Sequence, residues 1–421
     1  MKSAREIIHQ SQTTSYHYHT LQNGIRLVHR STSTAVSHLA LMVNIGSRDE
    51  EENENGMAHL IEHMIFKGTG KRNAFHVISF LENVGCDLNA YTTKEEICIH
   101  GTFLPHYYDR ALELFADIAF HSTFPPKDLE KEKEIIIDEI NSYKDNPSEE
   151  IFDEFENLLF QGHPIGRPIL GTPESLQSLN RQKLLRFISK NLDTSEMVLA
   201  SVGNIPFKKL IALTKKYFEP ESAHQKHTQR NPISHYAPRS LHIERDSFLS
   251  HCLTGVPAYP SDHPRRLSLE LLNNMLGGPM LNSRLNRNIR EKYGFAYSLY
   301  SSYTSYSDTG WLGIYVATDP KTLEKTLKLI HKELHKLRDE SIGVLQLARA
   351  KQQLIVLLAI SLESGLNEAL SIGRNMLLKE KIEPIQETIR RINSISKEEL
   401  LETANEVFNP KLFSTLILTQ P

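Results

Sequence analysis

The chain repeats one order of predicted secondary structure on either side of a segment, 219–239, that has no apolar periodicity. Each half is expected to run through strands, two helices, two strands, several helices and a final strand. Such a repeat indicates two diverged copies of one domain. We therefore expect an α+β fold of two homologous domains, each an antiparallel-rich sheet packed with helices. The predicted domains span residues 1–218 and 240–421, and a linker spans 219–239.

Composition excludes several classes of function. Hydrophobic residues make up 39% and charged residues 24% of the chain, as in ordinary globular proteins, and a net charge of −3 gives no field for nucleic acid or a membrane surface. The longest apolar run, 354–360, is too short to span a bilayer, and the segment 1–10 lacks the apolar core of a signal peptide. The acidic run 49–54 is expected to be a solvated loop, or else a field near a metal. Three scattered cysteines favour a reducing, cytoplasmic location, with a removed targeting segment as the alternative.

A histidine pair in the first half carries the clearest chemical signal. A helix that begins at Gly56 and ends at 67–68 would place His59 and His63 one turn apart on one face. Two imidazoles in that relation can hold one zinc ion. Glu62 lies on the flank of the same face, where it can reach a metal-bound water. The alternative is a helix with two unrelated histidines and a surface glutamate.

A third ligand is predicted on the helix over 129–144. Its 3.6-residue period places Glu132 and Glu139 on the apolar side, about 10 Å apart along the axis. Burying carboxylates without partners would cost several kcal/mol. Both therefore extend to the edge of the apolar face, pair with Lys or Arg, or serve a site. In the last case Glu139 is the third zinc ligand, and Glu132 orients a ligand histidine or the bound water. Two histidines and one glutamate leave the fourth zinc position for water, as in catalytic sites.

These residues resemble a known family, the pitrilysin-type zinc peptidases, in the branch of the mitochondrial processing peptidase β subunit and its bacterial relatives. That family carries His-x-x-Glu-His, a glutamate 76 residues after the second histidine, here Glu139, and an acidic residue seven before it, here Glu132. Nearly the whole chain shares the resemblance. The similar segments are 46–50, 63–69, 88–92, 163–172, 283–285, 289–294 and 296–298.

The resemblance implies a zinc metalloendopeptidase with one Zn²⁺ per chain. Glu62 would accept the proton of the attacking water and pass it to the leaving amine, with no covalent intermediate. Asn89 and Ala90 would lie on an edge strand that pairs with extended substrate. From the pattern alone, an interior strand is equally compatible with these two residues.

The resemblance also assigns residues of the second half. By pattern alone, Arg290 is a surface cation and Tyr297 a core aromatic residue. The family implies instead that Tyr297 donates to the tetrahedral oxyanion and that Arg290 holds substrate carbonyls. The turn 277–278 is similar to a flexible segment of the family that touches substrate, and it is equally compatible with a helix C-cap.

The resemblance further implies an assembly and a substrate class. Two domains of this kind would enclose a chamber for unfolded peptides and oligopeptides. A homodimer, or else a heterodimer, is expected to complete the enclosure, and neither nucleic acid nor a membrane is an expected partner. The alternative is a non-catalytic or hetero-oligomer-dependent member that acts as a partner or scaffold subunit. Such members usually lose the histidines or glutamates of the motif, and this chain keeps them.

Overall fold

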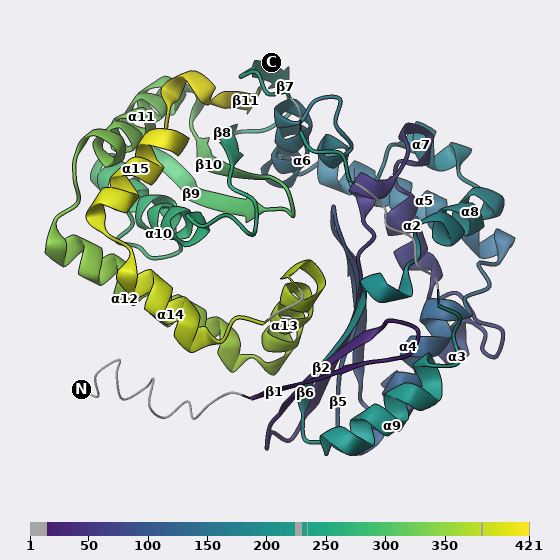
Figure 1. Cartoon of the computed structure of the whole chain (residues 1–421). Helices are drawn as coiled ribbons and strands as arrows, with labels where there is room; N and C mark the ends of the chain where they lie inside the picture. Colours follow the sequence, from purple (N-terminus) through teal and green to yellow (C-terminus); the bar gives the residue numbers. More distant parts are fainter. Residues whose placement is uncertain (1–14, 224–229, 234, 380–381, 421) are drawn as a thin grey trace. The chain divides into compact units, whose positions relative to one another are not determined.

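The computed structural model describes residues 15–223, 230–233, 235–379 and 382–420, which form two compact units (Figure 1). Unit 1 is built from 1–140, 169–230 and 359–386, and unit 2 from 141–168, 231–358 and 387–421. The N-terminal segment predicted to lack a signal peptide, 1–10, lies outside the described residues. The described part of the predicted linker contains no helix or strand.

Unit 1 contains a six-stranded sheet in the order β1-β2-β6-β3-β5-β4. Strands β2 and β6 pair in parallel, and all other neighbours pair antiparallel. Strand β4 is an edge strand, which excludes the interior-strand alternative. The strands are β1 Tyr16–Thr20, β2 Arg26–Ser31, β3 Ser37–Val43, β4 Asp87–Thr92, β5 Ile97–Phe103 and β6 Met197–Gly203.

Unit 2 contains a five-stranded sheet in the order β7-β11-β8-β10-β9. This order equals that of unit 1 without β1, strand for strand, and the first and last strands again pair in parallel. The predicted duplication is therefore confirmed at the level of topology. The strands are β7 Ser240–Glu244, β8 Ser250–Ala258, β9 Ala296–Ser305, β10 Gly310–Thr318 and β11 Ser414–Thr419.

Both faces of the unit 1 sheet are covered. Alternating residues of β3 separate the two cores: Leu39 and Leu41 pack with helices of the first half, whereas Ala40 and Met42 pack with α13. In Figure 1, α4 and α9 lie on one side of this sheet and α13 on the other. The helices are α2 Met57–Met64, α3 Ala74–Glu82, α4 Tyr108–Phe120, α5 Pro126–Lys144, α7 Pro173–Ser178, α8 Arg181–Asn191, α9 Phe207–Phe218 and α13 Gly365–Lys379.

The helices of unit 2 follow the same plan. Helix α6 packs on β8 and β11, and α10, α11 and α15 build the core of the opposite face. The sequence predicts an ordinary helix over 282–292, but residues 286–291 form a π-helix, η6. The helices are α6 Pro147–Leu159, α10 Arg266–Gly277, η6 Asn286–Glu291, α11 Leu323–Asp339, α12 Val344–Glu363, α14 Ile385–Ser394 and α15 Lys397–Val407.

The two halves exchange one helix each. Helix α13 of the second half covers β3 and β6 in unit 1, and α6 of the first half covers the equivalent strands, β8 and β11, in unit 2. The division predicted at 219–239 does not include this exchange. A sheet that is apolar on both faces needs a second covering layer, and local sequence patterns do not say which helix supplies it.

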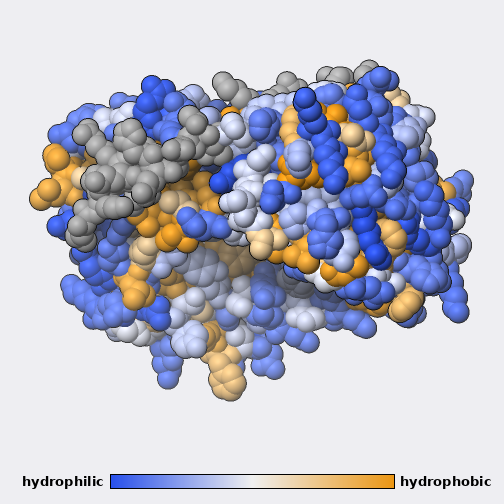
Figure 2. Space-filling view, turned by 90° about the horizontal axis from the view of Figure 1, so that it is seen from below, coloured by the Kyte–Doolittle hydropathy of each residue, from blue (hydrophilic) through white to orange (hydrophobic). Residues whose placement is uncertain are grey.

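Helix α12 is long and apolar enough to cross a membrane by length and composition, and little of it is buried. The apolar run 354–360, too short to span a bilayer, is only one part of this longer helix. Length and composition alone do not place a helix in a bilayer, because core helices of globular proteins meet the same criterion. On the face seen in Figure 2, apolar patches are separated by hydrophilic residues.

Substituting Gly373 tests the packing of α13 on the sheet. A Cβ atom at this position would lie 2.8 Å from Met42 Sδ and 3.1 Å from Ala200 Cβ. We expect Gly373→Leu to lower the free energy of unfolding by about 1–3 kcal/mol through overpacking. Urea denaturation measures the change. Gly70→Leu is the control, since none of the described atoms lies within 4 Å of a Cβ there. Equal urea midpoints for the two variants would contradict the packing.

Buried His29 predicts a pH dependence of stability. Its ring contacts the hydroxyls of Ser201 and Ser31, both at 3.1 Å, and burial lowers the pKa of His29 from 6.5 to about 4. Between these pH values the unfolded chain binds a proton that the folded chain does not, so stability falls as pH decreases from about 6.5 to about 4. Urea midpoints at pH 7 and pH 5 should differ less in His29→Gln than in the wild type. An unchanged difference would contradict the assignment.

Candidate metal centre

Helix α2 has a glycine, Gly56, as its N-cap, and the buried carboxylate of Glu50 contacts its first turn. Gly56 adopts a left-handed conformation, with φ of 92°, which glycine tolerates best. The Glu50 carboxylate accepts hydrogen bonds from the backbone N–H groups of Gly56 and Ala58, at 3.0 and 2.8 Å. An anion at a helix N-terminus is favourable because the N–H groups there lack partners within the helix. The prediction of a solvated acidic loop is thus wrong for Glu50 and for Glu54, which are both buried.

The histidines of α2 meet a glutamate of α5. The Nε2 atoms of His59 and His63 lie 3.3 and 3.8 Å from Glu139 Oε2. One ligand atom from each residue fits within a set whose members all lie within 4.8 Å of one another. Ligand atoms about 2 Å from a tetrahedral ion are separated by roughly 3.3 Å, so the three residues are placed to share one ion. The structure therefore brings together the predicted ligand set.

Glu132 lies behind this cluster. Its Oε2 accepts a hydrogen bond from His63 Nδ1 at 3.0 Å, and its Oε1 pairs with Lys67 Nζ at 2.7 Å. This buried carboxylate therefore pairs with a cation and also orients a histidine, so the two predicted alternatives apply at once. The contact leaves Nε2 of His63 facing Glu139.

Glu62 stands beside the cluster. Its Oε2 accepts a hydrogen bond from Thr92 Oγ1 at 2.6 Å and lies 3.4 Å from His59 Nδ1. Among the described residues, none forms a hydrogen bond with the other oxygen, Oε1. Thr92 is the last residue of β4, so the end of this edge strand contacts Glu62. The carboxylate is held firmly through one oxygen, and the other remains available to accept a proton.

The electrostatics of the cluster favour a cation. Burial opposes a charge on His59, but hydrogen bonds with Glu139 and Glu62 outweigh it and raise the pKa of His59 to about 9. Burial acts to raise the pKa of Glu62, and contacts with His59 and Thr92 lower it below its usual range. The hydrogen bond from His59 also lowers the pKa of Glu139. Negative charge is thus concentrated where the ligand atoms converge, and metal binding must displace the proton on His59.

The predicted substrate residues of unit 1 lie just before Thr92, the residue that contacts Glu62. Asn89 and Ala90 belong to β4, which has one unpaired edge. Asn89 is exposed and Ala90 half-buried. An edge strand offers free N–H and C=O groups to an extended peptide, so the strand meets the backbone requirement for the predicted role.

The two predicted substrate residues of the second half, Arg290 and Tyr297, belong to unit 2. Arg290 lies in η6 and is exposed. Tyr297 lies in β9 with 79% of its surface exposed, so the core-aromatic alternative is wrong. Helix α10 ends at Gly277 with Gly278 as its C-cap, in agreement with the capping interpretation.

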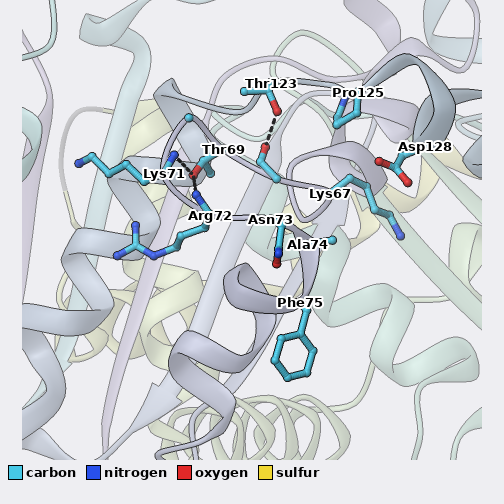
Figure 3. Close-up of a pocket in the computed structure, with 12 residues that line it drawn as sticks. Lys67, Thr69, Lys71, Arg72, Asn73, Ala74, Phe75, Thr123, Pro125 and Asp128 are labelled. Atoms are coloured by element: carbon cyan, nitrogen blue, oxygen red, sulfur yellow. Dashed lines mark hydrogen bonds between the residues drawn. The ribbon is translucent and has the colours of Figure 1, made fainter.

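Sequence reasoning missed two side chains at the cluster, Lys67 and Thr92. Both fall in segments similar to the family, but neither carried an assigned role. Lys67 also lines an open pocket of about 600 Å³ next to α3. Figure 3 shows Lys67 extending away from Lys71 and Arg72 in that pocket. The signal that could have found it is its position four residues after His63, one turn further along the helix predicted to end at 67–68, although α2 itself ends at Met64.

Two histidines and a glutamate next to a further, non-liganding glutamate are typical of metal-dependent hydrolases. Residues 26–173 match the family described as Insulinase (Peptidase family M16), and residues 178–354 match Peptidase M16 inactive domain. The chain is 32% identical to zinc protease YmxG of Bacillus subtilis over 400 residues, covering 95% of this chain and 97% of the relative. The chain belongs to peptidase family M16.

Further relatives agree with this assignment. The β subunit of the bovine mitochondrial-processing peptidase is 31% identical over 401 residues, covering 93% of this chain and 81% of the relative. A protease from Helicobacter pylori has the same fold, with a TM-score of 0.91 at 22% identity, and the match covers 97% of this chain and all of that one. The α+β fold of two homologous domains is confirmed.

Removing Lys67 should weaken metal binding. Lys67→Met would leave the buried Glu132 carboxylate without this cation and loosen the hydrogen bond that orients His63. We expect roughly a 10-fold rise in the dissociation constant of Zn²⁺. This is the lower end of the effect usually seen when a residue that supports a metal ligand is removed. Competition with a chromophoric chelator measures it. Lys71→Met, in the wall of the same pocket, is the control, and equal constants for the two variants would exclude the effect.

Proposed function

We propose that this chain is a zinc-dependent endopeptidase that hydrolyses unfolded peptides and oligopeptides. The observation that carries the proposal is the convergence of His59, His63 and Glu139 next to Glu62, in a chain of an M16 peptidase family. Relatives of this chain are named zinc proteases, and two histidines with one carboxylate suit zinc. One Zn²⁺ per chain is held by the three residues.

In the proposed mechanism, His59, His63 and Glu139 would hold a zinc ion, which would supply an acidified water and polarise the scissile carbonyl. Glu62 accepts the proton of the attacking water on Oε1 and delivers it to the leaving amine. Thr92 holds the carboxylate through Oε2 during both transfers. Glu132 keeps the His63 ring oriented, and Lys67 in turn anchors Glu132.

The same proposal assigns the substrate contacts. An extended peptide adds to the free edge of β4 and pairs with the backbone at Asn89 and Ala90. Arg290 holds substrate carbonyls, and Tyr297 donates a hydrogen bond to the oxyanion. The exposure of both side chains supports these roles, and π-helical turns such as the one that carries Arg290 often occur at functional sites. Unit 2 thus acts as the substrate-binding partner of the metal-binding unit.

Glu62→Gln tests the general base. The amide cannot accept the proton, so peptide hydrolysis should fall by about 10²–10⁴-fold. Zinc content should remain one per chain, because Glu62 is not a ligand. Hydrolysis of a peptide library and metal analysis of the same sample measure both quantities.

His59→Ala and treatment with a chelator serve as controls for that experiment. Each should remove the metal together with the activity, and added Zn²⁺ should restore the chelated wild type. Full activity of Glu62→Gln would exclude the proposed base, and full activity of the metal-free wild type would exclude the zinc mechanism.

A second candidate function is that of a partner or scaffold subunit. One relative is named as a subunit of the mitochondrial-processing peptidase, which motivates this alternative. We propose instead an active homodimer in the cytoplasm, and the three free, buried cysteines are compatible with a reducing compartment. Native mass measurement of the purified chain distinguishes a homodimer from a chain that needs a different partner. Zinc binding without cleavage of any library peptide would favour the subunit alternative.

A further inference from the structure

The turn between β4 and β5, residues 93–96, is unusually well buried for a charged hairpin. Lys94, Glu95 and Glu96 each expose 2% of their surface, although such residues are rarely buried without partners. The turn directly follows Thr92, whose hydroxyl holds Glu62. Whatever holds this turn therefore also sets the position of the Glu62 carboxylate.

The backbone after β3 supports one side of the turn. Ser47 N donates to Thr93 O at 3.1 Å, and Arg48 N donates to Lys94 O at 2.9 Å. A Cβ atom on Gly46 would lie 2.3 Å from the Lys94 carbonyl, so the two backbones are packed against each other. This support comes from the first half of the chain.

A buried ion cluster holds the same turn. One of its members, Arg230, follows the predicted first domain in sequence. Arg230 binds both oxygens of Asp49 at 2.8 Å and donates to the backbone O of Glu95 at 2.9 Å. Arg48 pairs with the Glu95 carboxylate at 2.5 Å, and Arg230 lies 3.6 Å from the same oxygen. Two arginines and two carboxylates balance, which a buried cluster requires. Arg230 belongs to the segment that sequence analysis predicted to be a plain linker.

A second cation reaches the turn from the exchanged helix. Arg374 of α13 lies 3.5 Å from Glu96 Oε2, and Tyr91 OH donates to Glu96 Oε1 at 3.1 Å. Helix α13 belongs to the second half in sequence but to unit 1 in space. The turn that follows Thr92 is therefore held by cations from two segments that come after the first half of the chain.

We propose that Arg230 and Arg374 are positioning residues for the general base, acting through turn 93–96 and Thr92 on Glu62. The inference rests on the proposed function of Glu62. The contiguous segment 15–218 contains all predicted metal ligands but neither cation, so the linker and α13 complete its catalytic geometry. A displacement of about 1 Å at a reacting group can cost about 100-fold in rate, which makes one hydroxyl contact decisive.

The experiment compares Arg230→Met and Arg374→Met in the full-length, zinc-loaded protein. We expect kcat to fall by about 100-fold for Arg230→Met and by less for the half-exposed Arg374, with KM changed less than about twofold. Zinc content should stay at one per chain. Hydrogen exchange of the backbone amides over 92–97 should become faster in both variants.

Arg30→Met is the matched control. Arg30 pairs with Glu368 near the other end of α13, so this variant loosens the helix without touching the turn. Its kcat and its exchange over 92–97 should equal those of the wild type. Equal losses in Arg30→Met and Arg374→Met would show general loosening of α13 and overturn the role of Arg374.

Two further variants of Arg230 separate positioning from folding. Arg230→Lys keeps the charge and should recover at least a tenth of the wild-type kcat. If Arg230→Met does not fold, Arg230→Met with Asp49→Asn removes the buried charge together with its partner and should fold with a low kcat. Wild-type kcat and wild-type exchange in that double variant would overturn the proposal. If the wild type itself cleaves no peptide, the proposed function fails, whereas the exchange data still decide whether the cations hold the turn.

Discussion

Buried carboxylates need partners, and the structure around the candidate metal centre depends on this requirement. Glu50 takes its partners from the free N–H groups of α2 and thereby fixes the start of the helix that carries both histidines. Glu132 pairs with Lys67 and His63, and the half-buried Glu139 faces both imidazoles. Burying any of these carboxylates without a partner would cost free energy. The partners that remove this cost also orient the helix or the histidines of the site.

The duplicated topology gives this site a defined scaffold. Both sheets have the same strand order and the same parallel pair, and both are apolar on two faces. Each sheet receives its second layer from a helix of the other half, α13 in unit 1 and α6 in unit 2. Neither half of the chain can therefore bury its sheet alone, which links the folding of the metal-binding unit to residues that follow the linker.

Local patterns predicted much of this arrangement. The i, i+4 spacing of His59 and His63 and the 3.6-residue period of α5 placed the predicted ligands where the structure brings them together, since both patterns depend on a few residues of one helix. Local pattern without the family resemblance was wrong for Tyr297, which it made a core aromatic residue and which is exposed. The expectation of a solvated loop was wrong for Glu50 and Glu54, which are buried. Burial of a single residue depends on partners from elsewhere in the fold, and periodicity does not report them.

The repeated order of strands and helices, the predicted ligand set and the predicted base were all accessible from the sequence, because each rests on spacing within one element or on a resemblance that spans the chain. The fold itself was needed to show that Lys67 pairs with Glu132, that Thr92 holds Glu62, and that Arg230 and Arg374 reach the turn beside it. These contacts join residues up to 278 positions apart, as between Glu96 and Arg374. They arise from how layers pack, and a one-dimensional pattern carries no record of which distant side chain will balance a buried charge.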